Sequence, residues 1–282
     1  MRMPQSFFTA LILLAAGLGT AGAEEPKSRW EAGIALGAYS YTDWRGADHR
    51  NTTFLPLPYL IYRGERVHLA RDGLKIRLLD SDRLSINLAA AFSLAGRAAD
   101  NPLRAGMPKL LGTFKVGPVV NVNINSSPKP LIKWDLRLPV LAVAATNFRQ
   151  FRHAGFTAFP HLRGRYETEQ NGWTYLLGSS LGAELASEQN NDYFYQVRAS
   201  EARSTRPAYD AKAGYGGAAL SSYASASRGR WGYGVYARFD DLHGATFENS
   251  PLVQTKDFWS AGFGVSYRFF QSDAKVIDDD TE

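Results

Sequence analysis

Apolar and polar residues alternate with a period of two along the segment from Asp257 to Phe269. One face of this segment carries Trp259 and Phe263, and the other carries small or polar residues and Arg268. Successive side chains of a strand point to opposite faces, and a strand in a membrane barrel turns its apolar face towards lipid, with aromatic residues near the two interfaces. The pattern is therefore typical of a transmembrane β-strand.

Similar alternation recurs in three further segments, 114–124, 132–138 and 231–240. Eight less regular strand candidates cover residues 30–41, 54–63, 66–70, 74–79, 84–94, 156–167, 173–185 and 211–226. Twelve is an even number, as expected for a bacterial barrel whose two ends lie in the periplasm. The sequence therefore predicts an all-β fold, a transmembrane antiparallel up-and-down β-barrel of about twelve strands, with ten or fourteen as alternatives.

The segments between the strand candidates alternate between tight turns and long connections. The long ones, at 42–53, 95–112, 145–155, 186–210 and 241–256, are assigned to the outer face. An exception is Arg71-Asp72-Gly73, which we interpret as a short outer hairpin, although a single bulged strand over 66–79 is an alternative. The aromatic segment 192–209 is expected to fold inward as a plug.

Four prolines fall inside strand candidates, at Pro56, Pro58, Pro118 and Pro139. Proline has no backbone N–H and cannot donate a hydrogen bond to a neighbouring strand. We therefore expect bulges or local distortion at these positions.

The N-terminus carries Arg2, an apolar stretch from Phe7 to Leu18 and the cleavage pattern Ala21-Gly22-Ala23. This order is that of a secretory signal peptide, and the apolar stretch is shorter than the roughly 20 residues that a membrane-spanning helix needs. We predict a cleaved signal peptide at 1–23, an outer-membrane barrel at 24–270 and a disordered, acidic periplasmic tail at 271–282. The chain contains no cysteine, which excludes disulfides and thiolate metal sites.

The formal net charge is +5, but the basic residues are spread singly along the strands instead of forming a patch, which argues against nucleic-acid binding. By alternation, twelve charged side chains are expected to face the lumen. They are Lys75, Arg77, Lys115, Lys133, Asp135, Arg137, Arg163, Arg165, Glu184, Arg238, Asp240 and Arg268. Either these charges pair across the lumen and occlude it, or they line an anion-preferring pore. Arginines at the rim are expected to bind lipopolysaccharide phosphates.

The sequence contains no pattern that indicates catalysis, a metal site or a cofactor. Its five histidines include no HExxH motif, and no G-x-S-x-G motif occurs. A soluble β-sandwich is a rival fold, but its outward faces should be polar, and here they would be aromatic.

Four blocks of residues in a fixed order carry a family resemblance. They are Leu55-Pro56-Leu57-Pro58-Tyr59 with Tyr62-Arg63-Gly64; Gly96-Arg97 with Asp100-Asn101-Pro102-Leu103 and Gly106; Tyr193-Phe194-Tyr195-Gln196-Val197 with Pro207-Ala208-Tyr209; and Asp240-Asp241-Leu242 with Ser250-Pro251-Leu252-Val253. Together they resemble the MipA/OmpV family of Gram-negative outer-membrane proteins. The resemblance implies an outer-membrane barrel, and the best-known member of that family binds a lytic transglycosylase and a murein synthase. Other members look like adhesins or stress-responsive surface proteins.

Gly264, Tyr267 and Phe269 resemble the signal that the barrel-assembly machinery recognises, which usually ends the chain at its aromatic residue. Here further residues follow, and they end in Asp278-Asp279-Asp280-Thr281-Glu282. This acidic end is interpreted as a solvated tail or as a docking segment for a basic periplasmic partner.

The sequence-based hypothesis is a non-enzymatic outer-membrane scaffold that tethers peptidoglycan-remodelling enzymes. The alternatives are a narrow anion-preferring channel and, less favoured, an adhesin or a lipid-modifying outer-membrane enzyme.

Overall fold

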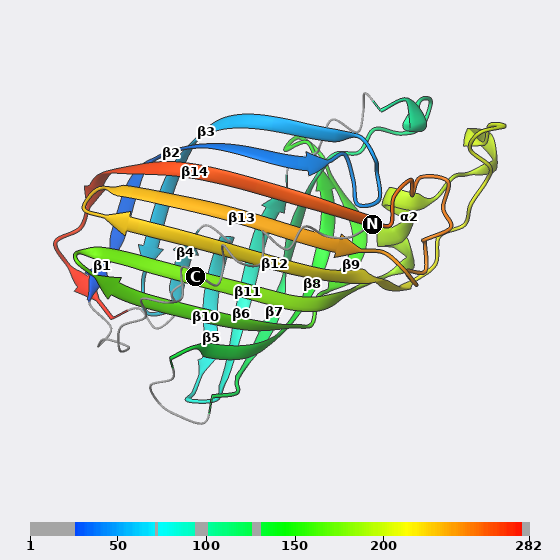
Figure 1. Ribbon diagram of the computed structural model, residues 1–282. Coiled ribbons are helices and arrows are strands. Elements are labelled where there is room, and N and C mark those ends of the chain that lie inside the picture. The colour runs from blue at the N-terminus through cyan, green and yellow to red at the C-terminus, as the bar shows by residue number, and fades with distance from the viewer. Residues whose placement is uncertain (1–25, 71–72, 94–100, 126–130, 278–282) are drawn as a thin grey trace, which may run out of the picture.

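The computed structural model describes residues 26–70, 73–93, 101–125 and 131–277 (Figure 1). The expected signal peptide at 1–23 and the last acidic residues, 278–282, lie outside this part of the chain. No helix among the described residues is long and apolar enough to cross a membrane.

The described strands form a closed antiparallel barrel. Their bounds are β2 Trp30–Thr42, β3 Arg50–Arg63, β4 Val67–Ala70, β5 Gly73–Asp80, β6 Leu84–Ser93, β7 Gly112–Asn123, β8 Lys133–Thr146, β9 Phe151–Ala158, β10 His161–Gln170, β11 Trp173–Ala186, β12 Gly214–Arg228, β13 Trp231–Asp241 and β14 Asp257–Gln271. β9 and β10 both lie between β8 and β11 and are two halves of one strand interrupted at Phe159 and Pro160. The barrel thus has twelve strands, and the predicted fold class is confirmed.

The short hairpin predicted from Asp72-Gly73 is also confirmed. β4 and β5 pair antiparallel, with Ala70 opposite Gly73, so the alternative of one bulged strand is excluded. The connection predicted at 145–155 is shorter than expected, because β8 continues to Thr146 and β9 begins at Phe151.

The prolines behave in two ways. β3 pairs with β2 in one unbroken register through Pro56 and Pro58, so the bulges expected there are wrong. At Pro118 the expectation of distortion is correct, because the β7–β8 ladder has no pairs between Val116↔Ala142 and Val119↔Pro139.

One end of the barrel is covered by packed loops, which lie beside helix α2 (Glu188–Tyr195) in Figure 1. We call the apolar core of these loops the outer cap; its buried residues are Trp44, Ala47, Leu110, Tyr195, Val197, Ala211, Leu242, Ala245, Phe247, Leu252 and Phe258. Tyr195 stacks on Phe247 with ring centroids 3.7 Å apart. The segment 192–209, expected to fold inward as a plug, contributes Tyr195 and Val197 to this cap.

The first and last described strands meet at the opposite end of the barrel, which is the periplasmic end by the topology of bacterial barrels. β1 (Lys27–Ser28) pairs antiparallel with β15 (Lys275–Val276) in a two-stranded ribbon. The Lys27 ammonium also lies 2.6 Å from a Glu167 carboxylate oxygen of β10. Part of the tail that was expected to be disordered therefore has regular structure.

Gly155→Ala is expected to lower the free energy of unfolding by about 2–3 kcal/mol. Gly155 has φ +77°, and a Cβ there would clash with the Ser187 hydroxyl and the Asn190 backbone N at the start of α2. Urea unfolding measures the change. The control is Gly229→Ala, because Gly229 has φ +59° with open space around it. An equal loss in both variants would show that the α2 contact contributes nothing.

Candidate functional site

Four charged side chains meet in the lumen beneath the outer cap. Arg45 comes from the β2–β3 loop, Glu184 from β11, and Arg238 and Asp240 from β13. Asp240 is almost fully buried and accepts two hydrogen bonds from Arg238, at 2.7 and 2.8 Å, and one from Arg45 Nε at 3.0 Å. Arg45 also forms an ion pair with Glu184 and donates to the Gly216 carbonyl at 2.9 Å. This cluster therefore fastens an outer loop to the barrel wall from within.

A cavity of about 100 Å³ lies beside this cluster. Arg45, Glu184, Tyr195 and Phe247 line it together with Lys115 of β7. Within the described part of the chain, Lys115 forms no ion pair. The cavity is thus a small cationic space under the cap.

Two further charge clusters lie along the lumen wall. On β8 and β10, Asp135 pairs with Arg163 at 3.0 Å and with Arg165 at 3.7 Å. Towards the periplasmic end, Glu31 pairs with Arg63 at 2.6 Å and with Arg268 at 2.8 Å.

The twelve predicted lumen charges therefore fall into groups. Glu184, Arg238 and Asp240 meet beneath the cap; Asp135, Arg163 and Arg165 meet on β8 and β10; and Arg268 lies at the periplasmic end. Arg137 donates to the Asn121 side chain at 2.8 Å, and Arg77 pairs with Asp80 at 3.1 Å. Lys75, Lys115 and Lys133 lie on β5, β7 and β8, outside these groups.

Sequence analysis missed three partners of these charges. Glu31 and Arg63 lie within strand candidates, at positions where alternation points the side chain to the lumen. The sequence pattern could therefore have identified both. Arg45 lies in a loop, where no periodicity exists, and no pattern in the sequence could have placed it under the cap.

A second cavity, of about 230 Å³, opens among the outer loops. Its lining includes Arg104, Lys109, Arg152 and Arg198, with Asp192 as one of the acidic residues. Burial lowers the pKa of the Arg104 guanidinium to about 10. Because that value is still well above neutrality, the crevice keeps its cationic character at physiological pH.

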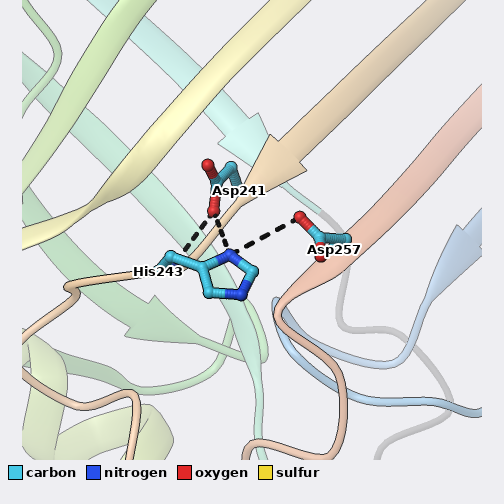
Figure 2. A group of neighbouring side chains, drawn as sticks. All are labelled: Asp241, His243 and Asp257. Carbon is cyan, nitrogen blue, oxygen red and sulfur yellow. Dashed lines mark hydrogen bonds and ion pairs between the residues drawn. The ribbon is translucent and has the colours of Figure 1, made fainter.

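Asp241, His243 and Asp257 cluster at the outer ends of β13 and β14, as Figure 2 shows. The His243 Nδ1 lies 2.7 Å from Asp241 Oδ1 and 3.7 Å from Asp257 Oδ1. His243 and Asp257 are exposed, Asp241 is partly exposed, and contacts within the cluster account for its geometry. The geometry alone does not make this cluster a metal site.

The proposed assembly signal lies on β14. Tyr267 packs against Trp231 with ring centroids 4.8 Å apart and against Phe269 at 5.3 Å. Gly264 pairs with Gly234 and Gly37 on the neighbouring strands. Assembly-machinery recognition remains a prediction.

Comparison with known proteins gives one family match. The family model described as MltA-interacting protein MipA matches residues 34–269. A comparison with curated proteins finds no match.

Among solved structures, the chain is similar to an outer-membrane channel from Pseudomonas putida F1, with 15% identity, a TM-score of 0.44, and coverage of 89% of this chain and 100% of that one. It is also similar to a bacterial polysaccharide outer-membrane secretin, with 10% identity, a TM-score of 0.39, and coverage of 85% and 99%. Likeness at this level carries no argument about function.

Proposed function

The chain belongs to the MltA-interacting protein MipA family and is located in the outer membrane, and from this premise we propose that it is a non-enzymatic scaffold. In this role the barrel anchors peptidoglycan-remodelling enzymes, a lytic transglycosylase and a murein synthase, at the inner face of the outer membrane. The family description supports the first of these partners, since it names an interaction with MltA.

The packed outer cap is the observation that carries the proposal. Leu242, Phe247 and Leu252 are almost completely buried in loops that cover one end of the barrel, whereas a general porin keeps a water-filled channel. Beneath them, Arg45 joins the cap to Asp240 and Glu184. A barrel built in this way favours anchoring over free diffusion of solutes.

The periplasmic end offers the surface for such partners. It combines the tight turns and the β1–β15 ribbon, and the acidic sequence Asp278-Asp279-Asp280 follows β15 closely in the chain. We propose that this tail docks on a basic surface of the partner.

The experiment is affinity capture of purified lytic transglycosylase and murein synthase by the full-length chain in detergent. We expect specific retention, and a several-fold loss in a variant with Asp278→Asn, Asp279→Asn and Asp280→Asn. An unrelated outer-membrane barrel is the control. Retention no greater than that control rejects the scaffold. Full retention by the triple variant rejects only the docking role of the tail.

A narrow anion-preferring channel is the second candidate. The lumen set holds nine basic and three acidic side chains, and Lys115 has no ion-pair partner among the described residues. Anion-selective conductance of the purified protein would favour this function over the scaffold.

A further inference from the structure

The barrel wall has a notch between β3 and β6. β3 runs from Arg50 to Arg63, but β4 pairs only with Tyr62 and Arg63. In this register Ala70 falls opposite Ile61, and by Gly73 the chain has turned back into β5. Between Arg50 and Pro58, the edge of β3 that faces away from β2 therefore has no strand partner among the described residues. These residues span about 30 Å along the strand at roughly 3.3 Å per residue.

This free edge lies at the depth of the lipid. At its outer end, Arg50 donates to the carbonyl of Trp259 at 2.6 Å, and the Trp259 ring packs against Phe239 in the outer aromatic girdle. At its other end, Pro58 lies opposite Ile34, which is itself opposite Tyr267. Tyr267 belongs to the aromatic cluster towards the periplasmic end. The notch therefore opens between the two girdles.

The two prolines of β3 adapt this edge to lipid. The backbone N–H of Arg63 donates to the carbonyl of Arg29, on the β2 side of the strand. Because backbone groups alternate in direction along a strand, the odd-numbered residues from 51 to 63 point theirs at β2. The even-numbered residues, including Pro56 and Pro58, point their backbone groups at the notch. An unpaired N–H in hydrocarbon costs several kcal/mol, and proline has none. At Pro56 and Pro58, towards its periplasmic end, the free edge therefore carries no donor, whereas Thr52 and Phe54 keep theirs.

The two prolines also argue against pairing of this part of the edge with a strand of another protein. An added strand binds through main-chain hydrogen bonds along the edge. Proline lacks the donor for these bonds and is therefore found in sheets mainly on edge strands that face no partner. The edge is therefore adapted to border lipid or an apolar ligand.

The lumen face of β3 beside the notch is apolar. Arg63 faces the lumen, where it pairs with Glu31, so Leu55, Leu57 and Tyr59 share its side of the strand. Leu57 is 51% exposed although it faces a lumen whose other walls carry charges. On the lipid face of the same strand Phe54 is 76% exposed. Apolar side chains thus flank the notch on both faces.

The strands across the notch carry cations on their lumen side. Lys75 lies opposite Ala89 of β6, and Lys115 of β7 lies opposite Ala91. Ala89 and Ala91 both lie on β6, between the two strands that carry these lysines. The combination of an apolar wall on β3 and ammonium groups on β5 and β7 matches a molecule with an alkyl chain and an anionic head.

We propose that the notch is a lateral portal through which single-chain anionic amphiphiles enter the lumen from the outer leaflet. The alkyl chain lies along Leu55, Leu57 and Tyr59, and the head group binds at Lys75 and Lys115. The portal goes beyond the scaffold function and does not depend on it.

Photocrosslinking in vesicles of phosphatidylglycerol and phosphatidylcholine tests whether lipid chains enter the notch. A benzophenone amino acid replaces Leu57, with Phe54 as the lipid-facing reference and Leu176 as the control. Leu176 faces the lumen from β11, on another part of the wall, because it shares the parity of Glu184. We expect lipid adducts at 57 and 54 and none at 176. Adducts at 54 alone would overturn the portal.

Binding of 11-(dansylamino)undecanoic acid to the refolded full-length chain tests recognition of the ligand. We expect Leu57→Asp to weaken binding at least tenfold and Leu176→Asp to leave it unchanged. Lys115→Gln should weaken binding of the acid several-fold but should not change binding of the neutral amide of the same chain length. If Lys115→Gln changes binding of both probes equally, the head group does not bind at Lys115. If Leu57→Asp and Leu176→Asp weaken binding equally, the alkyl chain does not lie along β3. No murein enzyme is present, so these results are independent of the scaffold test.

Discussion

Phe247→Ala is expected to open the outer cap while leaving the barrel folded. Phe247 is 1% exposed and stacks on Tyr195, and removing such a ring costs about 3–5 kcal/mol. This free energy is lost from the loops and not from the barrel, because Phe247 lies outside the strands whose pairing closes the barrel. Local opening governs amide exchange, so hydrogen exchange of cap amides such as Leu242, which donates to Lys256, should accelerate by about two orders of magnitude or more.

Two controls separate the cap from general destabilisation. The amides of the β13–β14 ladder should exchange as in the wild-type protein, and heat-modifiable gel mobility should be retained. Phe148→Ala removes a ring that is 71% exposed in another outer turn, and its effect should stay within about 0.5 kcal/mol. If Phe247→Ala leaves the exchange of the cap amides unchanged, the cap is not held by its apolar core.

Asp240→Asn is expected to lower the free energy of unfolding by about 3 kcal/mol or more. The carboxylate is 1% exposed and neutralises Arg45 and Arg238, and removing one partner of a buried ion pair leaves the remaining charges uncompensated. Urea unfolding of the reconstituted barrel, followed by tryptophan fluorescence, measures the change. Asp257→Asn is the matched control because its carboxylate is largely exposed, and a change within about 0.5 kcal/mol is expected there.

The double variant Arg45→Met, Asp240→Asn tests the cause of this loss. If uncompensated charge is responsible, removing Arg45 as well restores part of the lost stability, and the two effects are not additive. Strictly additive losses would mean that Arg45 and Asp240 contribute independently.

The strands were predictable because lipid and water impose opposite demands on successive residues. Trp231, Tyr233 and Val235 of β13 are all exposed on the lipid side, in the phase that the sequence indicated. The β4–β5 hairpin was found from Asp72-Gly73 for a local reason, since that dipeptide favours a tight turn.

Features set by contacts between distant segments were not predictable. Arg45 reaches Asp240 across 195 positions of the sequence, and the loop that carries it has no periodicity. Pro56 and Pro58 were interpreted as sites of bulges, because the sequence does not show that β4 is too short to cover them. The β1–β15 ribbon depends on the closure of the barrel, which brings Lys27–Ser28 and Lys275–Val276 together.

A scaffold role requires above all that the outer cap closes the lumen to free diffusion. The measurement that tests this most directly is single-channel conductance of the refolded wild-type protein in a planar bilayer, with salt gradients to determine ion selectivity. If the cap closes the lumen, the correctly folded barrel gives no stable conductance steps. Stable, anion-preferring steps from the wild-type protein would contradict it and would establish the channel in place of the scaffold.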